Sequence, residues 1–517
     1  MKASNENPVW INERLDGLTS WDADWAGLRV VVTGLGVSGF AAADTLIELG
    51  ARVVVVDGKD SAENRQKSET LKIVGAAEVI LGEEAMNSVP AVEGQDAELV
   101  VTSPGLRPTL GILADACTRK IQIWGDVELA WRLNRRAGRK TPQWLCITGT
   151  NGKTTTVGMT ESILQAAGTK TIAVGNVGTP ILDALRDPVE YDFFAVELSS
   201  FQLHWTYSMA PLASVVLNVA EDHVDWHESF QNYLADKARI YENTKIACIF
   251  NVTQPETITM VEEAEVQEGC RAIGFHADTP AVSMLGVVEG LLIDRAFTDN
   301  RYNEALELAE VNDTGALPTK HTVENALAAA ALARAAGAEP ADIQKGLLSF
   351  EPGAHRIQLV ANTHGVLWVN DSKATNPHAT NASLASFNPV IWIAGGLSKG
   401  VDYAELVREH SQRLKAVLVI GTDTSGLLAA LETEAKTVPV YTISENSGDP
   451  TNGREVLHQA VKKAYDIAEQ NDTVLLAPAA ASMDQFISYA ERGNIFIDEV
   501  TALVDSINMN HPSSTSE

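Results

Sequence analysis

The sequence predicts an α/β protein made of three successive domains, and three observations lead to this prediction. The chain has 517 residues, which is too long for one hydrophobic core. Short apolar runs rich in valine and isoleucine alternate with helical segments, which is typical of parallel sheets. A basic stretch at 132–140 and a Pro-Gly turn at 352–353 interrupt this alternation. We therefore predict domains at 1–140, 141–353 and 354–517.

Composition narrows the class of protein. The chain is 45% hydrophobic and 21% charged, and no apolar run reaches the ~18 residues that a membrane helix needs. Its four cysteines lie far apart without a Cys-x-x-Cys pair, which indicates reduced thiols. A net charge of −29 argues against general nucleic-acid binding. We expect a cytoplasmic protein that neither inserts into membranes nor binds nucleic acid.

The first domain begins with an N-terminal extension of 27 residues. It carries Trp10, Trp21 and Trp25 among acidic residues, and we expect it to pack loosely on the domain. Parallel strands follow at 28–34, 52–57 and 97–105, with a helix at 39–49.

A glycine-rich turn follows the first strand. Its sequence, Gly34-Leu-Gly-Val-Ser-Gly39, opens the helix, and Asp57 lies 23 residues after Gly34. This spacing fits the dinucleotide fingerprint, which leaves an NAD-linked oxidoreductase open as a hypothesis. Physically it predicts a backbone nest for a diphosphate and a carboxylate near a ribose or a uracil. A purely structural turn is the remaining alternative.

A second glycine turn opens the central domain. After the apolar run 144–148, the motif Gly149-Thr-Asn-Gly-Lys153-Thr154 is two residues shorter than the general P-loop. Its backbone N–H groups and the following helix dipole favour phosphate, Lys153 adds a cation, and Thr154 offers a hydroxyl to Mg²⁺. The motif predicts a user of ATP or GTP. The residues expected to hold the nucleotide are Gly149, Thr150, Asn151, Gly152, Lys153, Thr154 and Thr155.

Further strands of the central domain end in polar residues. Strands are expected at 193–197, 213–218 and 246–251, and Glu197 ends the first of them, where a carboxylate often holds Mg²⁺. His223 follows the second strand with acidic neighbours, which suits a metal ligand or a polar loop. Lys237 lies in a helical stretch and by itself predicts a solvated side chain. We also expect an exposed acidic excursion at 296–316 and a helix at 323–336.

The last domain repeats the pattern, with strands expected at 366–370, 390–394, 416–420 and 473–477. Basic residues stand beside or after its turns and strands. Such cations suit a phosphoryl group or a carboxylate. They are His355, Arg356, Lys373 and Lys399.

Taken in order, these motifs resemble the Mur ligase family of cell-wall synthesis over residues 28–504. The shortened P-loop matches, and the segments 197–203, 221–223, 370–376 and 482–486 look like the D-glutamate-adding member. The resemblance implies a Rossmann-like N-terminal domain for a UDP-linked substrate. It also implies a P-loop ATPase-like central domain for ATP and a Rossmann-like C-terminal domain for the incoming amino acid.

The resemblance also implies a reaction. An ATP-dependent ligase of this kind joins D-glutamate to UDP-N-acetylmuramoyl-L-alanine through an acyl phosphate, and it releases ADP and phosphate. The cofactors expected are ATP, Mg²⁺ at two sites and a carbamate on Lys237, and the expected state is a monomer. The first Mg²⁺ would be held by Thr154 and Glu197, and the second by Glu197, His223 and the carbamylated Lys237.

Residue by residue, the resemblance assigns the remaining roles. Adenine and ribose would be held by Asn325 and Asp371, and Arg356 would face the phosphates with His355 nearby. The D-glutamate would be received by Lys373, Thr375, Lys399, Ser482 and Tyr489. The UDP part would be held by Val37, Ser38, Asp57, Ser103, Gly105 and Asn176. The set expected to take part in catalysis is Lys153, Glu197, His223, Lys237, His355, Arg356 and Lys373. A third hypothesis, a non-catalytic nucleotide-binding switch, also stays open.

Overall fold

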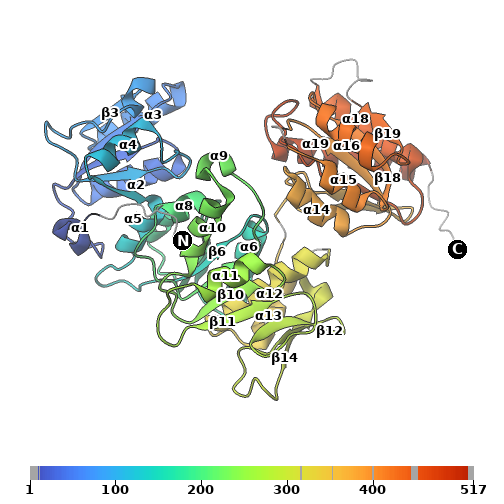
Figure 1. Cartoon of the computed structure of the whole chain (residues 1–517), viewed down its shortest axis with the longest axis horizontal. Helices are drawn as coiled ribbons and strands as arrows, with labels where there is room; N and C mark the ends of the chain where they lie inside the picture. The colour runs from blue at the N-terminus through green and yellow to red at the C-terminus, as the bar shows by residue number, and fades with distance from the viewer. Residues whose placement is uncertain are drawn as a thin grey trace. The chain divides into compact units, whose positions relative to one another are not determined.

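The computed structural model describes residues 10, 12–314, 317–351, 353–398, 401–443 and 452–510, with side chains to 507 (Figure 1). The chain folds into two compact units. The first comprises Met1–Val311 with Glu324–Phe350, and the second comprises Asn312–Val323 with Glu351–Glu517. The first unit holds two sheets and the second holds one. The domain boundaries at 140/141 and 353/354 stay predictions.

The first sheet has five parallel strands in the order β3-β2-β1-β4-β5. The order reverses between β1 and β4, and ligands of such sheets bind beyond the strand ends at that reversal. The three expected strands and the helix are confirmed, whereas β3 and β5 were not expected. The strands are β1 (Arg29–Thr33), β2 (Arg52–Asp57), β3 (Glu78–Leu81), β4 (Leu99–Thr102) and β5 (Gln122–Gly125). The helices are α2 (Val37–Glu48), α3 (Ala62–Val74), η1 (Glu83–Met86), α4 (Gly111–Thr118) and α5 (Asp126–Leu133).

The N-terminal extension packs tightly where it is described, so the expectation of loose packing is wrong. It forms helix α1 (Glu13–Gly17), and Trp25 is only 1% exposed. The Trp25 ring meets Trp124 edge to face, with ring centroids 6.4 Å apart. Arg132 donates to the carbonyl oxygens of Leu15 and Leu18. Large apolar rings gain free energy by leaving water, which ties this segment to the first core.

The central sheet has nine strands in the order β14-β13-β12-β11-β10-β9-β6-β8-β7. The strands are β6 (Gln143–Thr148), β7 (Thr171–Gly175), β8 (Phe193–Glu197), β9 (Ala213–Val216), β10 (Ala247–Asn251), β11 (Arg271–Phe275), β12 (Met284–Val288), β13 (Leu291–Asp294) and β14 (Leu306–Glu310). The expected exposed excursion at 296–316 is wrong in part. Strand β14 pairs antiparallel with β13, and its residues Leu308 and Ala309 are both 2% exposed.

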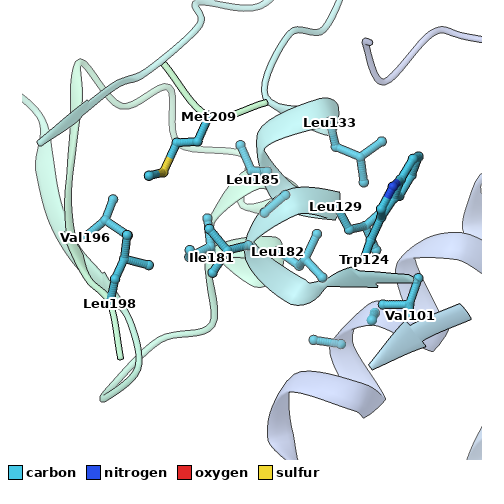
Figure 2. Packing of buried hydrophobic residues seen from close by; sticks show 14 of the residues in the cluster. Val101, Trp124, Leu129, Leu133, Ile181, Leu182, Leu185, Val196, Leu198 and Met209 are labelled. Carbon is cyan, nitrogen blue, oxygen red and sulfur yellow. The ribbon is translucent and has the colours of Figure 1, made fainter. Parts of the chain in front are cut away.

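Helices alternate with the strands along this part of the chain, and the expected helix at 323–336 is confirmed. They are α6 (Lys153–Ala166), α7 (Ile181–Arg186), α8 (Ser200–His204), α9 (Val224–His227), α10 (Phe230–Ala238), η2 (Arg239–Tyr241), α11 (Pro255–Glu262), η3 (Val311–Thr314), α12 (Lys320–Ala335) and α13 (Pro340–Ser349). One hydrophobic cluster joins the first two sheets. Figure 2 shows Val101 and Trp124 on one side, Val196 and Leu198 on the other, and Ile181 between them.

The C-terminal sheet has the order β15-β16-β20-β17-β18-β19, and only the β15–β16 pair is antiparallel. Two hydrophobic clusters fill its two faces, as expected for a sheet with helices on both sides. The four expected strands are confirmed. The strands are β15 (Gln358–Thr363), β16 (Val366–Asn370), β17 (Val390–Gly395), β18 (Leu414–Ile420), β19 (Val440–Thr442) and β20 (Thr473–Leu476). The helices are α14 (Pro377–Ala385), α15 (Ala404–His410), α16 (Ser425–Glu434), α18 (Gly453–Ile467) and α19 (Tyr489–Asn510).

Within the ranges that the structure describes, none of the helices combines the length and apolar character needed to cross a bilayer.

Candidate functional site

The P-loop turns at the carboxyl end of β6. Gly152 adopts a left-handed backbone with φ of 85°, and a Cβ there would lie 2.4 Å from Asn325 Oδ1. Glycine is therefore required for both the turn and the close approach of α12. Lys153 Nζ donates to the carbonyl oxygens of Gly149 at 2.7 Å and Thr150 at 3.1 Å. The Lys153 ammonium group thus lies against the loop at the start of α6.

Asn218 holds the loop in shape, a role that the sequence analysis missed. The Asn151 amide donates to Asn218 Oδ1 at 2.9 Å, and Asn218 Nδ2 donates to the Asn151 carbonyl at 3.1 Å. The Thr150 amide donates to the Asn218 carbonyl at 2.9 Å. The Thr150 hydroxyl also lies 2.8 Å from the Tyr233 hydroxyl. Two loop amides therefore bind Asn218, and only the position of Asn218 after a strand hinted at this.

Glu197 lies one strand away from the P-loop. Strands β6 and β8 are neighbours with Ile147 opposite Glu197, so their ends meet at the same edge of the sheet. Glu197 is 2% exposed, and Asn176 Nδ2 donates to Glu197 Oε1 at 2.9 Å. Asn176, expected to contact the UDP-linked substrate, thus lies beside the expected Mg²⁺ ligand. A buried carboxylate with an amide donor suits a cation site.

Lys237 is buried, so the solvated side chain expected from its helical context alone is wrong. The residue is 2% exposed in α10, and its Nζ donates to Thr148 Oγ1 at 3.3 Å. Its Nζ also lies 4.8 Å from the centroid of the Tyr233 ring. Burial holds the pKa of Lys237 well below its usual value, and the nearby Lys153 cation lowers it further. This shift favours the neutral, nucleophilic form of the Lys237 amine.

His223 stands immediately before α9 with a left-handed backbone, φ 53°. Its Nε2 lies 3.6 Å from Asp222 Oδ2, and its ring centroid lies 4.8 Å from that of Phe201. Partial burial lowers the pKa of His223, which the Asp222 carboxylate opposes, and Lys237 lowers it further. A neutral imidazole is the form that binds metal ions.

Among the residues that the structure describes, no group of three or more His, Cys, Asp or Glu side chains converges closely enough to hold a metal ion. Mg²⁺ bound with a nucleotide commonly takes one or two carboxylates from the protein, and the rest of its oxygen ligands come from phosphates and water. The hydroxyl of Thr154 and the carboxylate of Glu197 fit that donor set.

The glycine turn after β1 also depends on close approaches. A Cβ on Gly39 would lie 1.8 Å from the Gly34 carbonyl oxygen, and a Cβ on Gly34 would lie 2.6 Å from Ser103 Oγ. Asp57 Oδ2 accepts a hydrogen bond from the Leu35 amide at 2.6 Å. The Asp57 carboxylate thus stabilises the turn itself.

The other residues expected to bind UDP surround this turn. Val37 begins α2 and is 68% exposed. Ser38 hydrogen-bonds the buried carboxyl of Asp126, whose pKa is raised by burial. Gly105 follows β4 near Ser103, and a Cβ there would meet open space.

The second unit gathers the polar groups that follow β16. His355 is 5% exposed, and Asn370 Nδ2 donates to its Nδ1 at 2.9 Å. A Cβ on Gly493 would lie 2.2 Å from that same Nδ1. Burial lowers the pKa of His355. Arg356 is half-buried beside His355.

Asp371 and Lys373 lie on the loop after β16. Asp371 is 7% exposed, contacts the Ser383 hydroxyl and accepts from the Ile357 amide at 3.3 Å. Burial raises the pKa of Asp371 to about 6. Lys373 Nζ lies 3.8 Å from the centroid of the Tyr489 ring. The structure thus brings together Lys373 and Tyr489, two residues that were expected to receive D-glutamate.

Two further expected residues complete this neighbourhood. The Thr375 amide donates to the Lys373 carbonyl at 2.8 Å. Ser482 is 4% exposed, and its loop is joined to the 372 loop by Arg492, which donates to the carbonyls of Ser372 and Ala480. Lys399 lies outside the described residues. The contacts of Arg492 and Asn370 could not be predicted from the sequence, because no local motif indicates the partners of either residue.

A strand–P-loop–helix unit and a buried acid on the adjacent strand, in a chain with two further sheets, are typical of a nucleotide-binding α/β protein. Family models match most of the chain: the "Mur ligase MurD-like, N-terminal domain" at 28–125, the "Mur ligase middle domain" at 147–333 and the "Mur ligase, glutamate ligase domain" at 355–480. The chain belongs to the Mur ligase family and has its three-domain α/β fold. This membership leaves the NAD-linked hypothesis without support.

Curated relatives are similar over nearly the full length. A protein of Leifsonia xyli subsp. xyli is 47% identical over 94% of this chain and 94% of its own length. A protein of Streptomyces coelicolor is 49% identical over 93% of this chain and 99% of its own. Both relatives are named UDP-N-acetylmuramoylalanine--D-glutamate ligase.

Solved structures share the fold at low identity. MurF ligase from Thermotoga maritima, solved in complex with ADP, is 15% identical with a TM-score of 0.53 and covers 94% of this chain and 99% of its own. A pseudomurein peptide ligase type C from Methanothermus fervidus is 18% identical with a TM-score of 0.51 and covers 93% and 100%.

Proposed function

We propose that this chain is an ATP-dependent ligase that joins D-glutamate to UDP-N-acetylmuramoyl-L-alanine, in the cytoplasm and as a monomer. The single observation that carries the proposal is the 47% and 49% identity, over nearly the whole chain, to relatives named for that activity. The reaction needs ATP because a carboxylate is a poor electrophile. Transfer of the γ-phosphoryl group to the substrate carboxylate gives an acyl phosphate, which the D-glutamate amine attacks with release of phosphate.

The P-loop would bind the triphosphate. The amides of Thr150 and Asn151 already bind Asn218, so contacts to the phosphates would come from the rest of the motif: Gly149, Gly152, Lys153, Thr154 and Thr155. Helix α6 has 14 residues, and its N-terminus favours anions. Asn325, packed against Gly152, would then contact adenine.

Mg²⁺, when bound, would neutralise the two anions that must approach each other. Thr154 and Glu197 would hold the first ion, and Glu197, His223 and Lys237 the second. Lys237 can act as a ligand of Mg²⁺ only after carbamylation. In that step its neutral amine forms an N–C bond with CO₂ and releases one proton. The lowered pKa of the buried Lys237 supports this step, because only the neutral amine is nucleophilic.

The remaining residues would position the other reactants. The turn shaped by Asp57 and Ser103, together with Val37, Ser38, Gly105 and Asn176, would bind the UDP-linked substrate. Lys373, Thr375, Ser482, Tyr489 and Lys399 would bind D-glutamate, whose two carboxylates suit two lysines. Asp371 would hold the ribose, and Arg356, with His355 beside it, would face the phosphates.

The test is phosphate release by the purified chain with ATP, Mg²⁺ and UDP-N-acetylmuramoyl-L-alanine, challenged with a panel of amino acids. We expect release only when D-glutamate is present. Equal turnover with L-lysine or meso-diaminopimelate would move the chain to a sister activity. The absence of ligation with every amino acid, alongside measurable nucleotide binding, would favour the nucleotide-binding switch.

A further inference from the structure

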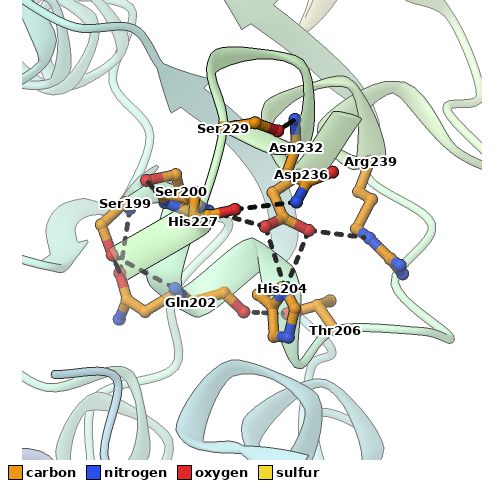
Figure 3. Close-up of polar contacts among 10 residues, drawn as sticks. All are labelled: Ser199, Ser200, Gln202, His204, Thr206, His227, Ser229, Asn232, Asp236 and Arg239. Atoms are coloured by element: carbon orange, nitrogen blue, oxygen red, sulfur yellow. Dashed lines mark hydrogen bonds and ion pairs between the residues drawn. The ribbon is translucent and has the colours of Figure 1, made fainter. Parts of the chain in front are cut away.

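A buried polar network surrounds Asp236, the residue that precedes Lys237 in α10 (Figure 3). Asp236 is 6% exposed, and its carboxylate accepts from His204 Nδ1 at 2.9 Å and from His227 Nδ1 at 2.9 Å. Arg239 Nε lies 3.5 Å from Asp236 Oδ1. On the far side of the His227 ring, Nε2 accepts from the Ser200 hydroxyl at 2.9 Å.

The Ser200–His227–Asp236 chain has the residue types of a hydrolytic triad, but its burial argues against that role. Ser200 is 2% exposed and His227 is 4% exposed. A nucleophile must reach its substrate, so these groups act on the protein around them.

The network joins the three segments that carry the proposed ligands of the second Mg²⁺. Helix α8, which holds Ser200 and His204, begins three residues after Glu197. Helix α9 begins directly after His223 and ends at His227, one helical turn later. Helix α10 holds Lys237 next to Asp236. The Asp236 carboxylate on α10 therefore binds one side chain from α8 and one from α9, and so links the three helices.

The geometry also fixes the direction of Lys237. Adjacent residues on a helix point about 100° apart, so anchoring Asp236 to two imidazoles sets the rotation of α10 about its axis. That rotation decides whether Lys237 points toward Thr148. Hydrogen bonds to a buried carboxylate are short and strong, which suits a rigid anchor.

We propose that Asp236 is a positioning residue that places Glu197, His223 and Lys237 relative to one another and thereby preorganises the second Mg²⁺ site. The inference rests on the proposed function. Partners behind metal ligands commonly contribute roughly 10–100-fold to metal affinity.

The test uses the full chain with ADP and with Mn²⁺ as the probe, free Mn²⁺ being counted by electron paramagnetic resonance. We expect two Mn²⁺ per wild-type chain, and we expect Asp236→Asn to weaken the second roughly 10–100-fold. The matched control is Asp294→Asn. Asp294 is 0% exposed and also accepts several hydrogen bonds, from Ala296, Phe297 and Arg334.

The outcomes separate the two proposals. A wild-type chain that binds fewer than two Mn²⁺ counts against the metal sites of the proposed function. Wild-type affinity in Asp236→Asn, or an equal loss in Asp294→Asn, overturns the positioning role. If Asp236→Asn does not fold by circular dichroism, His204→Asn takes its place, because it removes the His204 ring from Asp236 and leaves the contact between His227 and Asp236. Asp236→Glu, which keeps the carboxylate, is expected to recover part of the affinity.

Discussion

The amino group of Lys237 lies 3.3 Å from the hydroxyl oxygen of Thr148, the last residue of the strand that leads into the P-loop. This contact joins a buried lysine on α10 to the start of the phosphate-binding turn. Lys237, whose helical context predicted a solvated side chain, therefore lies beside the loop that would bind nucleotide in the proposed reaction. This position agrees with the role proposed for Lys237 as a ligand of the second Mg²⁺.

Replacement of this side chain is the first prediction. Lys237→Ala is expected to lower kcat by about 100-fold or more, since a ligand of the second Mg²⁺ is lost. Added formate or acetate is expected to restore part of the rate by supplying a carboxylate. The control is Lys245→Ala, a half-buried lysine of the same unit that lies over the Trp131 ring. Full activity of Lys237→Ala without additives would show that no carbamate acts here.

The second prediction concerns the shape of the P-loop. Asn218→Ala removes two side-chain hydrogen bonds to Asn151. Leaving those backbone groups unpaired costs about 1–3 kcal/mol, which we expect to appear as a KM for ATP roughly 10-fold higher. The KM for D-glutamate is expected to stay unchanged, because the residues proposed to bind that substrate lie outside the P-loop. Steady-state kinetics measure both, and an unchanged KM for ATP would mean that the loop keeps its shape without Asn218.

The third prediction is a pH dependence of stability set by Asp371. Its pKa is raised by burial to about 6, so the folded state holds this proton more tightly than the unfolded chain does. Ionising Asp371 therefore costs stability, increasingly from pH 4 to pH 6. Each pKa unit is about 1.4 kcal/mol.

Asp371→Asn tests this dependence because an amide does not ionise. Relative to the wild type, the variant is expected to gain about 1 kcal/mol or more in free energy of unfolding between pH 5 and pH 7.5. Urea denaturation at both pH values measures the difference. A difference that stays constant, or that shrinks as pH rises, would contradict the raised pKa.

The fourth prediction concerns the N-terminal extension. Trp25→Ala is expected to destabilise the first unit by about 3–5 kcal/mol, the usual cost of truncating a buried aromatic residue. Thermal unfolding measures it. Tyr302→Ala, at a residue 70% exposed, serves as the control and is expected to leave the melting temperature unchanged. Equal melting temperatures for both variants would mean that the extension contributes nothing to the fold.

Much of the fold could be predicted from local patterns. The strands at 28–34 and 366–370, and the helix at 323–336, have periodicities that their own residues determine. Strands such as β3 and β14 could not be predicted, because their polar residues face outward and only pairing with a neighbour makes them strands. The packing of Trp25 was missed for a similar reason, since its partner Trp124 lies far along the chain.

The sequence by itself determined the two glycine turns, the residues that surround them and the family to which the chain belongs. Each of these depends on neighbours in the chain, so the spacing of Gly149, Gly152 and Lys153 suffices. Only the tertiary structure decided that Lys237 is buried, that Asn218 binds two P-loop amides and that Asp236 joins three helices. Burial and hydrogen-bond partners arise from groups distant in sequence, and packing alone brings these groups together.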